Sequence, residues 1–185
     1  MSLLLVSVLS AAALLVLAFL GRRFLAYRGP RVIVCPETLQ PAGVELNAWL
    51  ATGASAIGET VLELQNCSRW PQREHCGQEC LSQIQACGEG TLVRNIVTTW
   101  YRDKCCAFCA RPISAIEWHD ALPALRRADG SLQQWSGIAA ADVPEVMATS
   151  EAVCWNCSIT ESFRREHPEL VIDRGRTPLR ETAIH

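Results

Sequence analysis

The sequence predicts an α+β protein in which one N-terminal transmembrane helix is followed by small, cysteine-rich α+β modules. Three observations support this prediction. An uncharged apolar run occupies residues 3–20, all ten cysteines of the 185-residue chain lie after it, and short strand-like segments alternate with segments of helical periodicity. The predicted organisation is an anchor (1–21), a basic juxtamembrane linker (22–31), a first cysteine module (32–90), a connecting helix (91–103), a second cysteine module (104–168) and a polar tail (169–185).

The anchor is predicted from length and composition. A helix over residues 3–20 would span roughly 27 Å, close to the hydrocarbon thickness of a bilayer. The alternative is a cleaved signal peptide, which needs a basic segment before a shorter apolar run and small residues at a cleavage site after it. No basic residue precedes this run, and its three consecutive alanines, residues 11–13, lie inside it. We therefore expect residues 3–20 to sit in the lipid bilayer.

Four arginines after the apolar run predict the orientation of the chain. Arg22, Arg23, Arg28 and Arg31 crowd its C-terminal side, and basic residues beside a transmembrane helix are retained in the cytoplasm. The soluble region is then expected to lie on the cytoplasmic side of the inner membrane. The formal net charge of −2 argues against a nucleic-acid partner, which would need a basic surface.

Strand patterns dominate the first module. Apolar or alternating segments favour strands at 31–38, 42–49 and 60–67, which would form a small antiparallel sheet. Residues 53–58 contain glycine and serine and are expected to form a loop between the second and third strands.

A helix is predicted after these strands, at about residues 78–87. Cys80, Ile84 and Cys87 fall on one face of such a helix, and Gly88 stands where a left-handed C-terminal cap would be. The following stretch, residues 91–101, has apolar residues at spacings of four and favours a connecting helix. Its threonines and valines leave a strand open as an alternative.

The second module begins near Cys105. A strand is expected around 113–118, a hairpin turn at Asp129-Gly130, a helix start at 142–144 and a final helix at 158–167. The charged stretch from about residue 172 lacks apolar periodicity and is expected to be a loosely ordered tail.

Two Cys-x2-Cys pairs carry the strongest chemical signal. In a reducing cytosol, cysteines at this spacing favour metal binding over disulfides, whereas in a periplasm the ten cysteines would suit a five-bridge framework. Cys106, Cys109, Cys154 and Cys157 provide the four thiolates that tetrahedral zinc prefers. A turn, a hairpin and a helix starting at the second pair resemble the treble-clef and zinc-ribbon folds over about residues 105–167. This resemblance implies a metal-binding scaffold rather than one activity.

A second metal site is predicted in the first module. Cys35 ends the first predicted strand, Cys67 ends the third, and Cys76 and Cys80 lie at the start of the predicted helix, so four sulfurs could converge. The neighbouring His75 could replace any one of these sulfurs. The alternative is that these cysteines are ordinary small core residues.

The remaining candidates are weaker. Cys87 is expected to be buried, and Cys105 is expected to be either a spare thiol or the true ligand in place of Cys106. His119-Asp120 could form an oriented base but is better explained as a loop, and no histidine follows either Cys-x2-Cys pair as c-type haem attachment requires. Tryptophans are expected in the core, with the one inside the second pair also shielding the metal: Trp49, Trp70, Trp100, Trp118, Trp135 and Trp155.

These residues predict a cofactor more clearly than an activity. One or two zinc ions held by four sulfurs each would leave no open position for a reacting water, so enzymatic zinc chemistry is not expected. The predicted role is a non-enzymatic scaffold or interaction subunit that binds a protein partner in a membrane-associated assembly. The alternatives are an iron–sulfur subunit for electron transfer, and a thiol oxidoreductase or metal-transfer protein.

Overall fold

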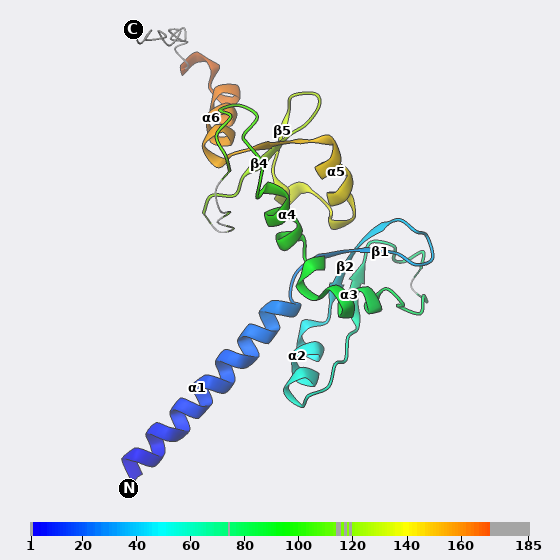
Figure 1. The fold of residues 1–185 in the computed structure, drawn as a ribbon, viewed down its shortest axis with the longest axis vertical. Helices are drawn as coiled ribbons and strands as arrows, with labels where there is room; N and C mark the ends of the chain where they lie inside the picture. Colours follow the sequence, from blue (N-terminus) through cyan, green and yellow to red (C-terminus); the bar gives the residue numbers. More distant parts are fainter. Residues whose placement is uncertain (1, 74, 114–115, 117, 119, 171–185) are drawn as a thin grey trace, which may run out of the picture.

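The computed structural model describes residues 2–73, 75–113, 116, 118 and 120–170. A long helix, α1, projects from a body of mixed helices and strands, so the predicted α+β class is confirmed (Figure 1). The body contains two three-stranded sheets, one on each side of the central helix α4. Each sheet belongs to one of the two cysteine-bearing halves of the chain.

The helix α1 spans Ser2–Tyr27, and its segment Leu5–Tyr27 is long and apolar enough to cross a membrane. Its described apolar side chains are exposed up to Phe19, whereas Phe24 and Tyr27 near its C-terminus are half-buried against the body. The helix continues through the first arginines, so residues 22–27 of the expected juxtamembrane linker are helical. Gly29, with a φ of +118°, and Pro30 follow the helix, and neither favours a further helical turn.

The first sheet is antiparallel with the order β1-β2-β3. Strand β1 covers Arg31–Val34, β2 covers Pro41–Leu46 and β3 covers Leu64–Cys67. One face of this sheet packs against α3, which spans Leu81–Cys87. All three strands were expected, but each is shorter than its predicted segment.

The predicted loop at 53–58 is largely wrong, because the helix α2 runs from Ala48 to Ala56. The Asn47 side chain caps this helix by accepting a hydrogen bond from the Leu50 backbone N–H at 3.1 Å. The helix lies against the C-terminal part of α1 (Figure 1). The rings of Phe24 and Trp49 are 4.5 Å apart in this contact. Trp49 is nevertheless 76% exposed, which contradicts its expected place in the core.

The buried face of helix α3 was predicted correctly for two residues and wrongly for a third. Cys80 and Ile84 are buried as predicted, but Cys87, expected on the same buried face, is exposed. The helix ends one residue before Gly88, which has a positive φ of 53° and begins the 3-10 turn η1, Gly88–Thr91. The chain turns away at this point, so the last residue of α3 has no core beneath it.

Arg31 differs from the other three arginines that follow the apolar run, because its side chain is buried and only 2% exposed. Its guanidinium donates hydrogen bonds to the Gly88 carbonyl at 2.7 Å, the Thr91 hydroxyl at 2.8 Å and the Ala26 carbonyl at 2.7 Å. Ala26 lies in the last turn of α1, where helix carbonyls lack partners within the helix. Arg31 therefore joins the end of α1 to β1 and η1.

The connecting helix α4 spans Val93–Tyr101, so helix rather than strand is correct for this segment. The second sheet follows, with the order β5-β4-β6: β4 is Ala124–Arg126, β5 is Leu132–Gln133 and β6 is Glu151–Val153. Asp129 and Gly130 form the predicted turn between β4 and β5, and Gly130 has a φ of 81°.

The strand expected at 113–118 is not found. Residues 114, 115 and 117 lie outside the described part of the chain, and the described residues 113, 116 and 118 are in neither strand nor helix. The short helix α5, Val143–Thr149, begins at the predicted position, and α6, Trp155–Glu166, begins three residues earlier than predicted. Short 3-10 turns complete the fold: η2 at Trp135–Gly137, η3 at Ala140–Asp142 and η4 at Pro168–Leu170. Of the predicted tail, residues 171–185 lie outside the described residues.

Tyr101 ties α4 to the second sheet. Its hydroxyl donates to the Ala124 carbonyl at 2.7 Å and accepts from the Trp135 indole N–H at 3.1 Å, and Tyr101 itself is 1% exposed. Tyr101→Phe leaves both partners buried without a hydrogen bond, so we expect it to lower the free energy of unfolding by about 1–3 kcal/mol. Thermal unfolding of the full chain in detergent, followed by tryptophan fluorescence, measures this loss. An unchanged midpoint would contradict the structural role of the hydroxyl.

The two halves contact each other where β2 meets η3. A Cβ placed on Gly43 would lie 2.8 Å from the Ala140 Cβ and 3.0 Å from the Ala141 nitrogen. Because the backbone of η3 must move to admit a methyl group, we expect Gly43→Ala to destabilise the protein by about 1–3 kcal/mol. Gly53→Ala is the matched control, since nothing lies within 4 Å of its added Cβ and alanine favours helix α2. Equal unfolding midpoints for the two variants would contradict the close contact between the halves.

Candidate metal centre

Two separate segments supply the four cysteines of the second module. Cys106 and Cys109 lie in a turn that follows α4, and Cys154 and Cys157 lie where β6 passes into α6. Strand β6 pairs with β4, and this pairing places the end of β6 beside the turn. The Ala107 backbone N–H donates to the Ala152 carbonyl at 2.9 Å and links the two segments directly.

The first pair is shaped by a tight turn. The Ala110 N–H donates to the Cys106 carbonyl at 2.9 Å, and the Cys106 N–H donates to the Arg111 carbonyl at 2.9 Å. Ala110 has a φ of 56°, a left-handed conformation that L-residues adopt at a cost. Such a turn brings both cysteine side chains to one side of the backbone.

The second pair lies at the N-terminus of α6. Cys154 is the N-cap residue, and its carbonyl accepts a hydrogen bond from the Ser158 N–H at 2.9 Å. The Cys154 N–H donates to the Cys106 sulfur at 3.4 Å. The free N–H groups at a helix N-terminus favour thiolate over thiol, so this placement suits an anionic ligand.

The four Sγ atoms lie within 4.8 Å of one another, and those of Cys109 and Cys154 are 3.9 Å apart. A tetrahedral ion with metal–sulfur bonds of about 2.3 Å separates its sulfurs by about 3.8 Å, whereas a disulfide brings them to about 2.05 Å. Cys106 is buried and the other three are half-buried. These residues therefore form a four-cysteine site with the dimensions of one bound metal ion.

Electrostatics within the site also favours a cation. Burial opposes ionisation of Cys106, but backbone N–H groups of Cys154, Cys109 and Phe108 face its sulfur and lower its pKa to about 6. Burial and the neighbouring sulfurs raise the pKa of Cys154 and of Cys157. The Cys106 sulfur is thus the readiest to ionise, while a positive charge among the sulfurs would favour ionisation of Cys154 and Cys157.

Three weaker candidates from the sequence remain to be placed: Cys105, Trp155 and the pair His119-Asp120. Cys105 is exposed and lies outside the four-sulfur group, so Cys106 is the member of the first pair. Trp155 lines a pocket together with Cys109, Cys154 and Cys157, but it is 37% exposed and is therefore not a core residue. His119 lies outside the described residues, and its neighbour Asp120 is exposed.

The other predicted cysteine set is arranged differently. Cys35, Cys67, Cys76 and Cys80 line one pocket, but no three of their sulfurs lie within 4.8 Å of one another among the described residues. Burial, followed by the charges of the other three sulfurs, raises the pKa of Cys80 to about 11. His75 is exposed and is not among the residues described around this pocket.

Cys35 differs from Cys80 in its hydrogen-bond donors. The Thr38 hydroxyl, followed by the backbone N–H groups of Thr38 and Glu37, lowers the pKa of Cys35 against the opposing effect of burial. Cysteine spacing gives no sign of this environment, because the Cys35 segment has no second cysteine at the spacing of a ligand pair.

No model of a known protein family matches the sequence, and comparisons with curated proteins and with solved structures find no significant match. The features of the chain that bear on function are a four-cysteine metal-binding site and one N-terminal helix long and apolar enough to span a membrane.

Proposed function

We propose that this chain is a membrane-anchored, non-enzymatic zinc protein that acts as a scaffold or interaction subunit of a membrane-associated assembly. The observation that carries the proposal is the group of four cysteine sulfurs within 4.8 Å of one another. Four thiolates complete the coordination of a tetrahedral ion, so the ion would stabilise the fold and leave no position for a reacting water.

The metal is proposed to be a single ion bound in a treble-clef-like unit. In a [4Fe–4S] cluster each of the four cysteines binds its own iron, which separates the sulfurs more than one shared ion does. The 3.9 Å distance between the Cys109 and Cys154 sulfurs therefore favours a mononuclear site. The order of cysteine turn, β4–β5 hairpin and helix α6 supports the treble-clef interpretation.

The proposed protein partner is supported by the exposed face of α6. Trp155, Ile159 and Phe163 recur every four residues along this helix and are 37%, 47% and 47% exposed. Residues at this spacing form one stripe on a helix, and an exposed apolar stripe is typical of a protein-binding surface. The metal site at the start of α6 would hold this stripe in place.

We further propose that the body lies on the cytoplasmic side of the inner membrane. Arg22, Arg23 and Arg28 follow the apolar part of α1 and support this orientation. Exposed Cys87 and Cys105 provide the test, because a membrane-impermeant maleimide should label them in broken cells and not in intact ones. Labelling in intact cells would place the body on the outer side of the membrane.

Metal analysis of the full chain, purified without oxygen in detergent, tests the proposed function. We expect zinc, a colourless protein and no labile sulfide. A brown protein containing iron and sulfide would support electron transfer instead. A protein without metal, in which Cys106, Cys109, Cys154 and Cys157 form disulfides, would overturn the proposal.

A further inference from the structure

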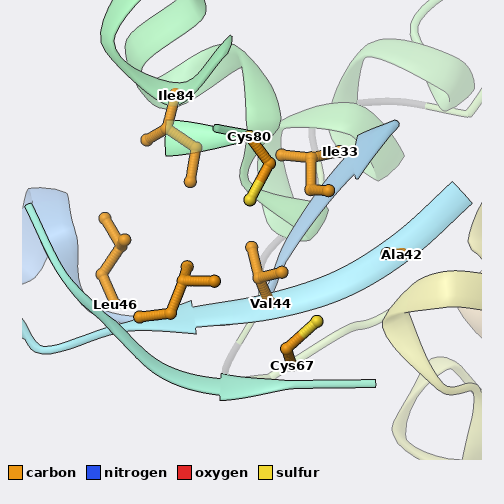
Figure 2. Packing of buried hydrophobic residues seen from close by; sticks show 8 residues of the cluster. Ile33, Ala42, Val44, Leu46, Cys67, Cys80 and Ile84 are labelled. Carbon is orange, nitrogen blue, oxygen red and sulfur yellow. The ribbon is translucent and has the colours of Figure 1, made fainter. Parts of the chain in front are cut away.

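Four cysteines of the first half line one pocket, although they come from three separate segments. Cys35 follows β1, Cys67 ends β3, and Cys76 and Cys80 precede α3. Cys67 and Cys80 are 9% and 6% exposed and belong to the apolar cluster between the sheet and α3 (Figure 2). The pocket has a volume of about 120 Å³, which is small and suits an ion rather than an organic ligand.

The turn that begins at Cys35 has the same backbone hydrogen bonds as the turn that begins at Cys106. The Leu39 N–H donates to the Cys35 carbonyl at 2.8 Å, and the Cys35 N–H donates to the Gln40 carbonyl at 2.9 Å. Leu39 has a φ of 55°, and Ala110 at the equivalent place in the other turn has a φ of 56°. Apart from the first cysteine the two turns share no residue, so the shared geometry reflects a common way of presenting a sulfur.

Hydrogen-bond donors surround the sulfurs of this pocket. The Arg69 backbone N–H donates to the Cys67 sulfur at 3.5 Å. The Cys154 N–H donates to the Cys106 sulfur in the same way in the four-cysteine site of the second half. The Thr38 hydroxyl faces the Cys35 sulfur, and the Arg69 Nε is buried without a hydrogen-bond partner among the described residues. Buried donors without acceptors are costly, and anionic sulfurs nearby would supply the missing negative charge.

We propose that Cys35, Cys67, Cys76 and Cys80 bind a second thiophilic divalent ion of the zinc class. These sulfurs are farther apart than the four sulfurs of the second half, so binding of an ion must draw them together. Cys35 and Cys76 lie outside the helices and strands, so their segments can adjust without breaking a regular element. The ion would close the pocket between the sheet and the start of α3 and would hold the two together.

Metal counting on the full chain in detergent tests this second site separately from the first. We expect two zinc ions per wild-type chain, one in the variant Cys76→Ser/Cys80→Ser and one in Cys154→Ser/Cys157→Ser. Cys87→Ser should retain two, because this exposed cysteine lies outside both groups. One zinc per wild-type chain that persists in Cys76→Ser/Cys80→Ser would overturn the second site and leave the proposed function intact.

A measurement on the wild-type chain covers the case in which a variant fails to fold. In the metal-loaded protein, Cys87 and Cys105 should react with an alkylating reagent, while the four pocket cysteines should react only after a strong chelator is added. Mass spectrometry of the digested protein identifies the modified cysteines. Alkylation of Cys76 or Cys80 at the same rate with and without chelator would contradict the site.

Helix α2 presents an uncharged apolar surface that is separate from both cysteine groups. Residues 47–58 carry no charge, and Trp49 and Ile57 are 76% and 74% exposed. This apolar surface lies beside the membrane-spanning candidate α1, at the ring contact between Phe24 and Trp49 (Figure 1). Phe24 directly follows Arg22 and Arg23, at the level where the apolar part of α1 ends.

We infer that α2 lies in the headgroup region of the bilayer that α1 crosses, a conclusion that rests on the proposed membrane anchoring. Tryptophan concentrates at the membrane–water interface, and an uncharged helix beside a transmembrane segment is continuous with the surface already in lipid. Lipid would cover the apolar residues that the protein leaves exposed. The body would then contact the membrane at two places, which limits its tilt.

Quenching of tryptophan fluorescence by brominated lipids tests this contact in reconstituted vesicles. We expect clear quenching of the wild-type protein and at least a twofold smaller quenched fraction in Trp49→Phe. Trp135→Phe is the control, because Trp135 is buried and its loss should leave the quenched signal unchanged. Equal quenching of wild type and Trp49→Phe, with the protein floating with the vesicles, would overturn the inference for α2 alone. A protein that does not float with vesicles would contradict the membrane anchor itself.

Discussion

Replacing Cys154 by serine is expected to remove one metal ion per chain and to unfold the second half of the body. Serine is a good N-cap residue, so the variant keeps the cap of α6 and loses only the sulfur ligand. Binding of a structural zinc contributes on the order of 10 kcal/mol, comparable with the stability of a whole domain. Metal analysis together with thermal unfolding of the full chain in detergent measures both effects.

The neighbouring cysteine provides the matched control for this prediction. Cys105 is exposed and outside the four-sulfur group, so Cys105→Ser should keep the wild-type metal content and unfolding midpoint. Treating the wild-type protein with a strong chelator should also unfold the second half of the body, although it removes every bound ion and not only the one that Cys154→Ser loses. Wild-type metal content and unfolding midpoint in Cys154→Ser would mean that these sulfurs do not bind the ion.

Arg31→Met is expected to lower the free energy of unfolding by about 3 kcal/mol or more. Methionine fills part of the same space but donates no hydrogen bond, so the Thr91 hydroxyl and the Ala26 carbonyl lose the guanidinium donor, while the Gly88 carbonyl keeps its bond from the Thr91 hydroxyl. Each bond to a charged group contributes about 1.5–3 kcal/mol, and the three acceptors lie in buried or half-buried contacts. Chemical unfolding of the full chain in detergent measures the change.

Arg28→Met separates this structural role from the role of arginine in membrane topology. Arg28 is exposed, and its side chain lies 6.0 Å from the centre of the Phe24 ring. Removing its charge should change stability by about 0.5 kcal/mol or less. If Arg28→Met and Arg31→Met destabilise the protein equally, the buried hydrogen bonds of Arg31 do not hold the end of α1.

Short-range patterns predicted several features of the molecule. The uncharged run at 3–20 indicated the helix α1, Asp129-Gly130 indicated the turn between β4 and β5, and the two Cys-x2-Cys pairs indicated the four-sulfur site. The apolar run is one continuous segment, and the turn and each cysteine pair lie within a few residues of sequence. The local backbone geometry of each therefore depends little on the rest of the fold, whereas the meeting of the two cysteine pairs depends on the fold.

The failed predictions concern residues whose surroundings come from distant parts of the chain. Residues 53–58 have the composition of a loop, yet most of them belong to α2, which packs against α1. Cys87 has the helical spacing of a buried residue, yet the core ends before it. Trp49 was expected in the core for its size, but it is 76% exposed and its ring lies beside Phe24 near the end of α1.

The sequence by itself determined the apolar helix, the positions of the cysteine pairs and most of the secondary structure, because each depends on local composition and spacing. Folding in three dimensions decided which arginine is buried, that the turn at Cys35 repeats the geometry of the turn at Cys106, and how far the sulfurs of each group stand apart. These properties depend on burial and on hydrogen bonds between segments tens of residues apart, and such partners exist only after the chain has folded.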